Sequence, residues 1–179
     1  MRPTLLLHIC CAPCLVSPYR YLREQFAVTG FWWNHNIHPF TEYQNRLACV
    51  RAFVKDEHID YIEHDHYGLV EFIRGVVDDT DNRCISCYRE RLEFTARYAA
   101  EHDFDYFSTT LLYSRRQKHE MIKRLAEELS AKYNIAFFYK DFREHWEEGI
   151  ALSKQAGLYR QKYCGCIYSE MDRYLGRFK

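Results

Sequence analysis

Eight cysteines are the side chains of this sequence best able to do chemistry, and seven of them fall into three groups. The groups are Cys10, Cys11 and Cys14, then Cys84 and Cys87, then Cys164 and Cys166, while Cys49 stands alone. Thiolates act as redox groups and as ligands for zinc, iron and iron–sulfur clusters. The first apolar stretch is too short for a secretory signal, so we expect a cytoplasmic protein. In that compartment clustered cysteines more often bind metals or do redox chemistry than form structural disulfides.

The first two cysteine groups allow three interpretations: structural zinc, an iron–sulfur cluster, or thiols without metal. The pair Cys84-x-x-Cys87 has the spacing of zinc ligands, whereas adjacent Cys10 and Cys11 are awkward ligands for one tetrahedral ion. Five thiols also exceed the needs of one zinc ion. A four-iron cluster spreads its four ligands over a larger volume, which suits two separate segments. We favour the cluster, with Cys14 available to a second iron.

The third group, Cys164-Gly165-Cys166, predicts a pair of thiols that act together. Glycine permits the unusual dihedral angles that a small disulfide ring would need, and such a bond would be easily reduced. A redox-active dithiol, two further metal ligands and two buried free thiols all remain open from the residues alone. Cys49 lies in an amphipathic stretch and is expected to be a small apolar residue of the core.

The equal numbers of basic and acidic residues, 25 of each, argue against a uniformly basic nucleic-acid-binding surface. The charge is nevertheless uneven, because two segments are locally basic: Arg115, Arg116, Lys118, Lys123 and Arg124, and then Lys154, Arg160, Lys162, Arg173, Arg177 and Lys179. Tyr159, Tyr163, Tyr168 and Tyr174 interleave with the second segment. Cations with interleaved aromatic rings suit single-stranded or looped RNA, although a solvated helix face with core tyrosines would give the same pattern. Arg115, Arg116, Lys118 and Arg160 are our candidates for substrate binding.

His38 is the histidine that stands out, because it belongs to a predicted turn, Asn36–Pro39, after the second strand. It could transfer a proton or cap the following helix. Tyr163, next to Cys164, is a second candidate proton donor.

Short apolar runs alternate with amphipathic stretches, which predicts an α/β fold with a parallel sheet covered on both faces. The expected strands are Thr4–Ile9, Val28–Trp33, Ile59–Glu63, Phe104–Ser108 and Ile135–Tyr139. The expected helices are Leu15–Phe26, Phe40–Glu57, Leu69–Val77, Cys84–His102 and His119–Tyr133. We expect one domain over residues 1–179, ending in a C-terminal helical tail (141–179) that carries the Cys-x-Cys motif. No apolar run approaches the length of a membrane span.

A parallel sheet of order 3-2-1-4-5 would bind its ligand beyond the carboxyl ends of strands one and four. Cys10, Cys11 and Cys14 follow the first of these strands, and Ser108-Thr109-Thr110 follow the other. No Gly- and Ser-rich phosphate loop follows the first strand, so we expect no use of ATP.

Five ordered blocks of this sequence together resemble the cobalamin-independent epoxyqueuosine reductases. They are LLLHICCAPC (5–14), NIHP (36–39) with Glu42 and Tyr43, RCISCY (83–88) with Arg91 and Leu92, FSTTLL (107–112) and GLYRQKYCGCIYS (157–169). The resemblance implies a Rossmann-like fold of the adenine nucleotide alpha-hydrolase type. It also implies reduction of epoxyqueuosine to queuosine at the wobble position of tRNA, with an external electron donor.

The resemblance implies a [4Fe-4S] cluster with a neighbouring mononuclear iron. Cys10, Cys11, Cys84 and Cys87 match the family's metal-binding motifs, and Cys164 with Cys166 matches its redox pair. Two alternatives stand beside this interpretation: a zinc-stabilised RNA-binding module and a thiol–disulfide oxidoreductase.

Overall fold

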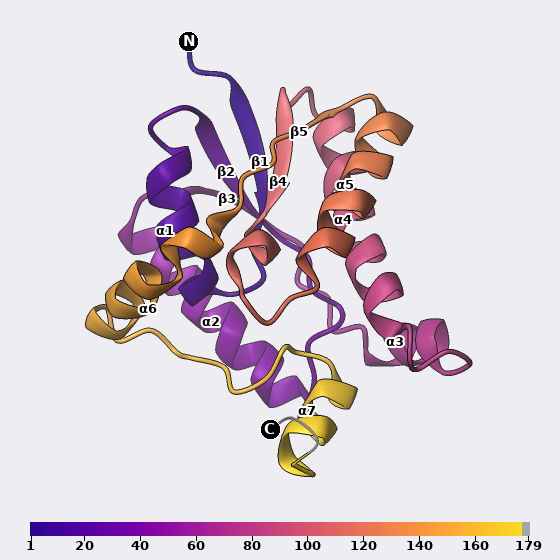
Figure 1. Ribbon diagram of the computed structural model, residues 1–179. Coiled ribbons are helices and arrows are strands. Elements are labelled where there is room, and N and C mark those ends of the chain that lie inside the picture. Colours follow the sequence, from indigo (N-terminus) through magenta and orange to yellow (C-terminus); the bar gives the residue numbers. More distant parts are fainter. Residues whose placement is uncertain (177–179) are drawn as a thin grey trace.

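The computed structural model describes residues 1–176 and contains one five-stranded, all-parallel sheet (Figure 1). The strands are β1 (Thr4–His8), β2 (Ala27–Trp32), β3 (Asp60–Glu63), β4 (Tyr106–Thr109) and β5 (Ala136–Phe137). Their order is β3-β2-β1-β4-β5, so the predicted α/β fold is confirmed, and β1 and β4 lie side by side at the point where the order reverses.

The central strand β1 is buried because sheet neighbours flank it and helices cover it. Leu5, Leu6 and Leu7 are fully buried, and β1 pairs with β2 on one side and β4 on the other. Such a strand has no solvent-facing side, which explains its continuous apolar run. Each strand lies within two residues of its predicted bounds, and β5 pairs over only two residues.

Helices cover both faces of the sheet (Figure 1). They are α1 (Ala12–Leu22), α2 (Phe40–Asp56), α3 (Leu69–Val76), α4 (Arg83–Glu101) and α5 (His119–Tyr133). α1 packs against α2, and α4 packs against α5. α1 begins earlier than predicted because Pro13 fits the first turn of a helix, and Cys14 therefore lies inside that turn rather than in a loop.

The C-terminal tail is less helical than predicted. A 3₁₀ turn, η2 (Phe142–His145), leads into α6 (Trp146–Gln155), which packs on α1, and the last helix is α7 (Ile167–Tyr174). Residues 156–166 between α6 and α7 form a non-helical connection, here called the tail loop, which carries Cys164 and runs beneath the sheet (Figure 1). Residues 177–179, the end of the predicted tail with Arg177 and Lys179, lie outside the described residues.

Within residues 1–176, no helix is both long enough and apolar enough to cross a membrane.

Candidate functional site

The carboxyl ends of β1 and β4 meet in a crevice. Hydrogen bonds between Cys10 and Thr110 connect the turns that follow these two strands. The backbone N–H of Cys10 donates to Thr110 Oγ1 over 3.0 Å, and the Thr110 hydroxyl lies 3.3 Å from Cys10 Sγ. Thr110 opens a 3₁₀ turn, η1 (Thr110–Tyr113), directly after β4. The reversal of strand order thus places the first cysteine group at this crevice, as ligand sites in open α/β sheets require.

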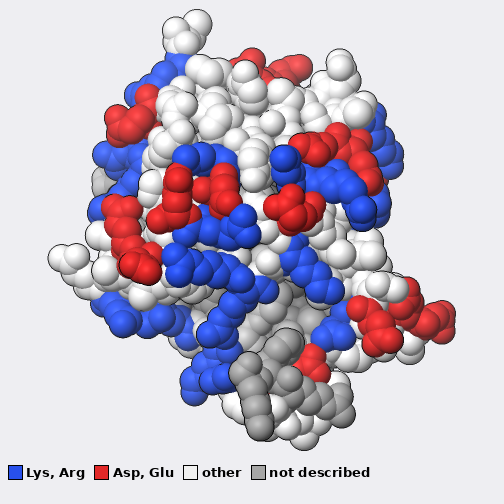
Figure 2. All heavy atoms as spheres, in the orientation of Figure 1, with Lys and Arg blue, Asp and Glu red and all other residues white. Residues whose placement is uncertain are grey.

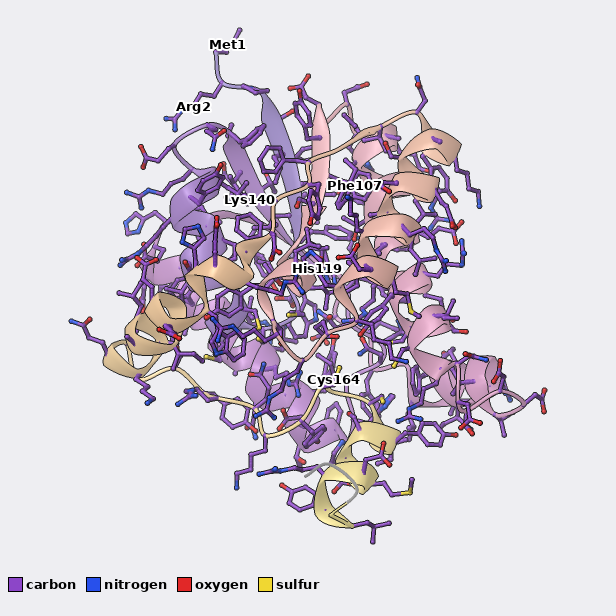
Figure 3. The ribbon with its side chains drawn as sticks, in the orientation of Figure 1. Met1, Arg2, Phe107, His119, Lys140 and Cys164 are labelled. Atoms are coloured by element: carbon purple, nitrogen blue, oxygen red, sulfur yellow. The ribbon has the colours of Figure 1, made fainter. Side chains whose placement is uncertain are left out.

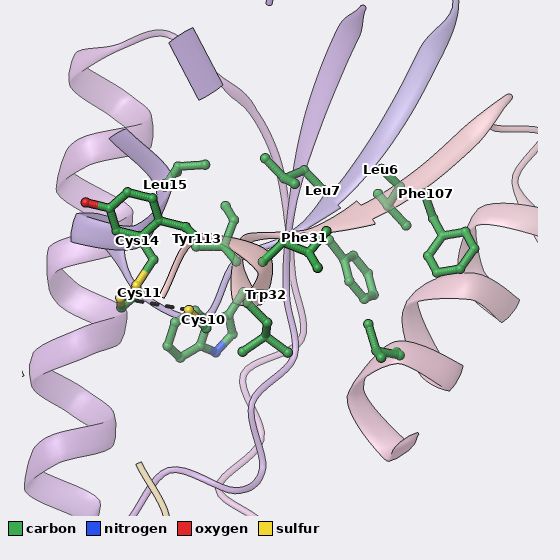
Figure 4. Close-up of a cluster of buried hydrophobic side chains, with 14 of the residues drawn as sticks. Leu6, Leu7, Cys10, Cys11, Cys14, Leu15, Phe31, Trp32, Phe107 and Tyr113 are labelled. Atoms are coloured by element: carbon green, nitrogen blue, oxygen red, sulfur yellow. Dashed lines mark hydrogen bonds between the residues drawn. The ribbon is translucent and has the colours of Figure 1, made fainter. Parts of the chain in front are cut away.

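Cys10, Cys11 and Cys14 form a buried three-cysteine group whose sulfur atoms all lie within 4.8 Å of one another (Figure 4). The Cys10 and Cys11 sulfurs are 3.9 Å apart, and the Cys11 and Cys14 sulfurs are 2.8 Å apart. Two thiolates bound to one ion through bonds of about 2.3 Å would lie roughly 3.8 Å apart. The Cys10–Cys11 separation matches this value, whereas the Cys11–Cys14 separation is shorter. Three buried thiols around one point are a donor set that could hold a metal ion.

Electrostatics within this group favours one thiolate. Hydrogen bonds from the thiols of Cys11 and Cys14, and from Thr110, hold the pKa of Cys10 well below its ordinary value. Burial raises the pKa of the Cys11 thiol. One negative sulfur with two protonated neighbours is a centre that a cation can enter by displacing protons, because metals bind the thiolate form.

The other two cysteine groups share a cavity of about 250 Å³, here called the thiol cavity, which is lined by Cys84, Cys87, Cys164 and Cys166. Cys84 and Cys87 lie in the first turn and a half of α4, and both come to this cavity from one helix face. Burial raises the pKa of Cys87 to about 12, with Arg91 opposing the shift. No sulfur of this cavity belongs to the three-cysteine group, within the part of the chain that is described.

A basic cavity of about 200 Å³ opens beside the three-cysteine group, whose Cys10 and Cys14 line it. Its basic lining residues are Arg46, Arg116, Arg160, Lys162 and Arg173. No Asp or Glu among residues 1–176 lines it. Figure 2 shows lysine and arginine side chains gathered over the lower part of the face in view.

Cys164 lines both cavities and lies below the carboxyl ends of the strands (Figure 3). Its sulfur accepts a hydrogen bond from the Gln117 amide over 3.3 Å. In the basic cavity, the Gln161 amide donates in the same way to Cys11 Sγ over 2.9 Å. One glutamine thus contacts the three-cysteine group and another contacts Cys164. Cys164 lines both cavities and so connects them.

Arg46 on α2 holds the tail loop in place. Its guanidinium donates to the carbonyl oxygens of Cys164 (2.8 Å) and Tyr163 (3.0 Å), while its Nε donates to Glu42 over 2.7 Å. Both charged side chains are buried, and Tyr159 donates its hydroxyl hydrogen to Glu42. A guanidinium presents its donors in a rigid fork, so this one residue fixes the direction of two successive peptide groups.

The structure buries His38 completely instead of exposing it to either cavity. Its backbone N–H donates to Gly165 O, and its carbonyl oxygen accepts the hydroxyl hydrogen of Tyr163. Burial lowers the pKa of His38 to about 4, so the imidazole is neutral near pH 7. His38 therefore supports the tail loop, whereas Tyr163 lines the basic cavity.

Buried, neutral His38 makes stability depend on pH. Its pKa of about 4 lies below the ordinary 6.5, so the unfolded chain binds more protons between these values. This contribution to stability is complete above pH 6.5 and is lost as the pH falls towards 4. In urea unfolding of the metal-free protein, we expect His38→Asn to lose less stability than wild type between pH 7 and pH 5, by on the order of 2 kcal/mol. Equal losses in both proteins would contradict this role.

The remaining predicted substrate residues do not all meet. Arg116 lines both cavities, Lys118 lines the thiol cavity, and Arg160 lines the basic cavity. Arg115 lines neither and pairs with Glu147 over 3.8 Å. Cys49 packs half-buried against the core from α2, as predicted.

Four residues at the site were given no role from the sequence, although Arg91 and Gln161 belong to blocks that carry the family resemblance: Arg46, Arg91, Gln117 and Gln161. The two arginines did leave a signal, because helical periodicity places each on the apolar stripe of its helix, Arg46 between Tyr43 and Val50. A buried arginine needs an acceptor or an anion there. The two glutamines lie outside the helices and leave no comparable pattern.

Comparison with known proteins supports one family over nearly the whole chain. The model of the family "Epoxyqueuosine reductase QueH" matches residues 5–172. The chain is 41% identical over 175 residues to an epoxyqueuosine reductase QueH of Dehalococcoides mccartyi, covering 97% of this chain and 96% of that protein. It is 35% identical over 179 residues to one of Thermotoga maritima, covering 95% and 92% of the two chains. A protein of the same name from Haemophilus influenzae is 32% identical over 177 residues, covering 94% and 72%. The protein therefore belongs to the epoxyqueuosine reductase QueH family of oxidoreductases.

Proposed function

We propose that this protein reduces epoxyqueuosine to queuosine at the wobble position of tRNA. The observation that carries the proposal is the buried three-cysteine group that opens directly into a basic cavity without carboxylates. A redox-capable sulfur site and a site for a polyanion thus share one wall. Neither a zinc-stabilised RNA-binding module nor a protein thiol oxidoreductase needs that combination.

The cations of the basic cavity hold the phosphates on either side of the target nucleotide. Arg160, Lys162 and Arg173 are exposed, so their charges are available to a backbone approaching from solvent. Charge neutralisation of this kind positions a nucleic acid without reading its sequence. A cavity of about 200 Å³ accepts one modified base rather than a duplex, so the nucleotide has to be turned out of the anticodon loop.

Cys10, Cys11, Cys84 and Cys87 are proposed to hold a [4Fe-4S] cluster, and Cys14 a neighbouring mononuclear iron. The donor chemistry of the three-cysteine group supports the metal. Arg91, which donates to Cys87 Sγ and whose charge also acts on Cys10, supports a ligand set drawn from two segments. When bound, this group supplies single electrons and a Lewis acid to the epoxide oxygen.

The overall reaction consumes two electrons and two protons for each epoxide, giving an alkene and water. The electrons come from an external electron donor. Cys164 and Cys166 line the same cavity as the proposed cluster ligands Cys84 and Cys87. We propose that they relay the electrons as a dithiol that becomes a disulfide. Tyr163 is our candidate proton donor because it lines the basic cavity, and its hydroxyl would have to turn from the His38 carbonyl oxygen to the substrate to act. We further infer that the reaction takes place in the cytoplasm. We also infer that residues 1–179 act as one domain, because residues 160–164 of the tail loop line the basic cavity together with Cys10 and Cys14.

The proposal is tested with purified protein, reconstituted anaerobically with iron and sulfide and supplied with a chemical reductant. Transfer RNA isolated from cells that accumulate epoxyqueuosine is the substrate, and nucleosides are identified by mass spectrometry after digestion. We expect queuosine to appear with loss of 16 mass units, the mass of one oxygen atom, at the expense of epoxyqueuosine. Unchanged epoxyqueuosine in the presence of a fully loaded, brown protein would overturn the proposal.

A further inference from the structure

Arg91 is a buried arginine whose positive charge has no carboxylate to balance it. It lies on α4 and is 2% exposed. Its Nη2 donates to Cys87 Sγ over 3.2 Å, its Nε donates to the Cys87 carbonyl oxygen over 3.0 Å, and its guanidinium lies over the ring of Tyr88. No Asp or Glu among residues 1–176 forms an ion pair with it. A buried cation without a counter-charge carries a large desolvation cost.

Arg46, the other buried arginine beside the thiols, differs from Arg91 because a carboxylate balances its charge. It is equally buried, yet Glu42 on its own helix pairs with it over 2.7 Å. Arg46 can therefore remain charged whatever the state of the cysteines. Arg91 also stays charged, but among the described residues the groups that balance its charge are sulfur atoms, so the balance depends on the state of the cysteines.

The thiols that act on Arg91 come from three segments of the chain. Cys87 belongs to α4, Cys164 to the tail loop and Cys10 to the turn after β1, and all three interact electrostatically with its guanidinium. These sulfurs are drawn from both cavities described above. Arg91 thus contacts Cys87 directly, and its charge acts on Cys164 and Cys10 as well.

We propose that Arg91 is a positioning residue that balances the negative charge of the thiolates near it, beginning with Cys87, which it contacts, and that it thereby favours the metal-loaded state. Each thiolate brought to a metal adds a negative charge to a buried site, and a fixed cation lowers the cost of collecting several of them. The proposal deepens the function proposed above by naming the residue that stabilises its metal centre, but metal binding can be measured without any tRNA reaction.

The test uses the metal-free protein titrated with cobalt(II), whose thiolate charge-transfer absorption reports sulfur ligation. We expect Arg91→Gln to raise the dissociation constant about tenfold or more, the effect typical of losing a hydrogen-bonding partner of a ligand. Arg91→Lys, which keeps the charge, is expected to stay within about threefold of wild type. Arg97→Gln is the matched control, since Arg97 lies on the same helix, is exposed and pairs with Glu101.

A second measurement covers the case in which Arg91→Gln does not fold. Arg91→Gln is combined with Cys87→Ser, which removes the thiol that Arg91 contacts, and folding is followed by circular dichroism. If Arg91 acts by balancing charge, the double variant is expected to fold. Arg91→Gln is then expected to weaken cobalt binding less in Cys87→Ser protein than in wild type. Wild-type cobalt affinity in folded Arg91→Gln would overturn the proposal. So would an equal loss in Arg91→Lys, because the role would then depend on shape and not on charge.

Discussion

Cys10→Ser protein is expected to be isolated almost free of iron and to reduce epoxyqueuosine at least about 10³-fold more slowly than wild type. Cys10 is the member of the three-cysteine group whose pKa is lowered, so it supplies the thiolate with which metal binding starts. Several kcal/mol of transition-state stabilisation from a bound metal correspond to a rate factor of roughly this size. Iron and acid-labile sulfide analysis, together with anaerobic turnover, measures both effects.

Cys49→Ser is the matched control for this prediction. Cys49 is half-buried on α2 and lines neither cavity, so its variant is expected to retain iron and turnover. If Cys10→Ser kept a full complement of iron, the three-cysteine group would not be the metal centre, whatever the activity.

Arg46→Met is expected to destabilise the protein by about 3–5 kcal/mol, because it leaves Glu42 buried without its partner. It also frees the carbonyl oxygens of Tyr163 and Cys164, so the tail loop is expected to loosen before the rest of the molecule unfolds. Urea unfolding gives the first effect. Faster alkylation of Cys164 by iodoacetamide, and faster proteolysis within residues 156–166, give the second.

Two further variants distinguish the loss of the Arg46 hydrogen bonds to the tail loop from a general loss of positive charge. Arg51→Met removes an arginine from the same helix, but Arg51 is half-exposed and its ion pairs are with Glu63 and Asp65, so a loss of only about 0.2–1 kcal/mol is expected. Arg46→Lys keeps the charge but not the fork, and it is expected to recover part of the stability while the loop stays loose. If the tail loop of Arg46→Met resisted alkylation and proteolysis as well as that of wild type, Arg46 would not be what holds the loop in place.

The fold was largely predictable because it depends on local patterns. Residues 4–9 read as a buried strand since β1 has neighbours on both sides, and the amphipathic stripe of residues 40–57 became α2 almost to the residue. The strand order followed from the general behaviour of alternating strands and helices. The prediction that cysteines gather at one sheet edge came from the same reasoning, since the carboxyl ends of parallel strands share an edge.

The tail shows where local pattern runs out. A helical tail was expected over residues 141–179, yet residues 156–166 are non-helical, and Arg46, Ser169 and His38 satisfy the peptide groups of residues 163–165. Those partners come from α2, α7 and the turn before α2, and no sequence window contains them all. The binding of a loop by distant side chains is a tertiary effect.

The residues of the chain are enough to predict the available chemistry: seven clustered thiols, a parallel sheet that carries them and a family resemblance. The division of the thiols follows from the folded arrangement, which places three around one point and four around a neighbouring cavity, with Cys164 lining both cavities. The folded arrangement also decides which buried arginine has a carboxylate and which depends on sulfur. Residue types and spacing are properties of the chain, whereas distances between segments 80 residues apart, and the charge balance across them, exist only once the chain has folded.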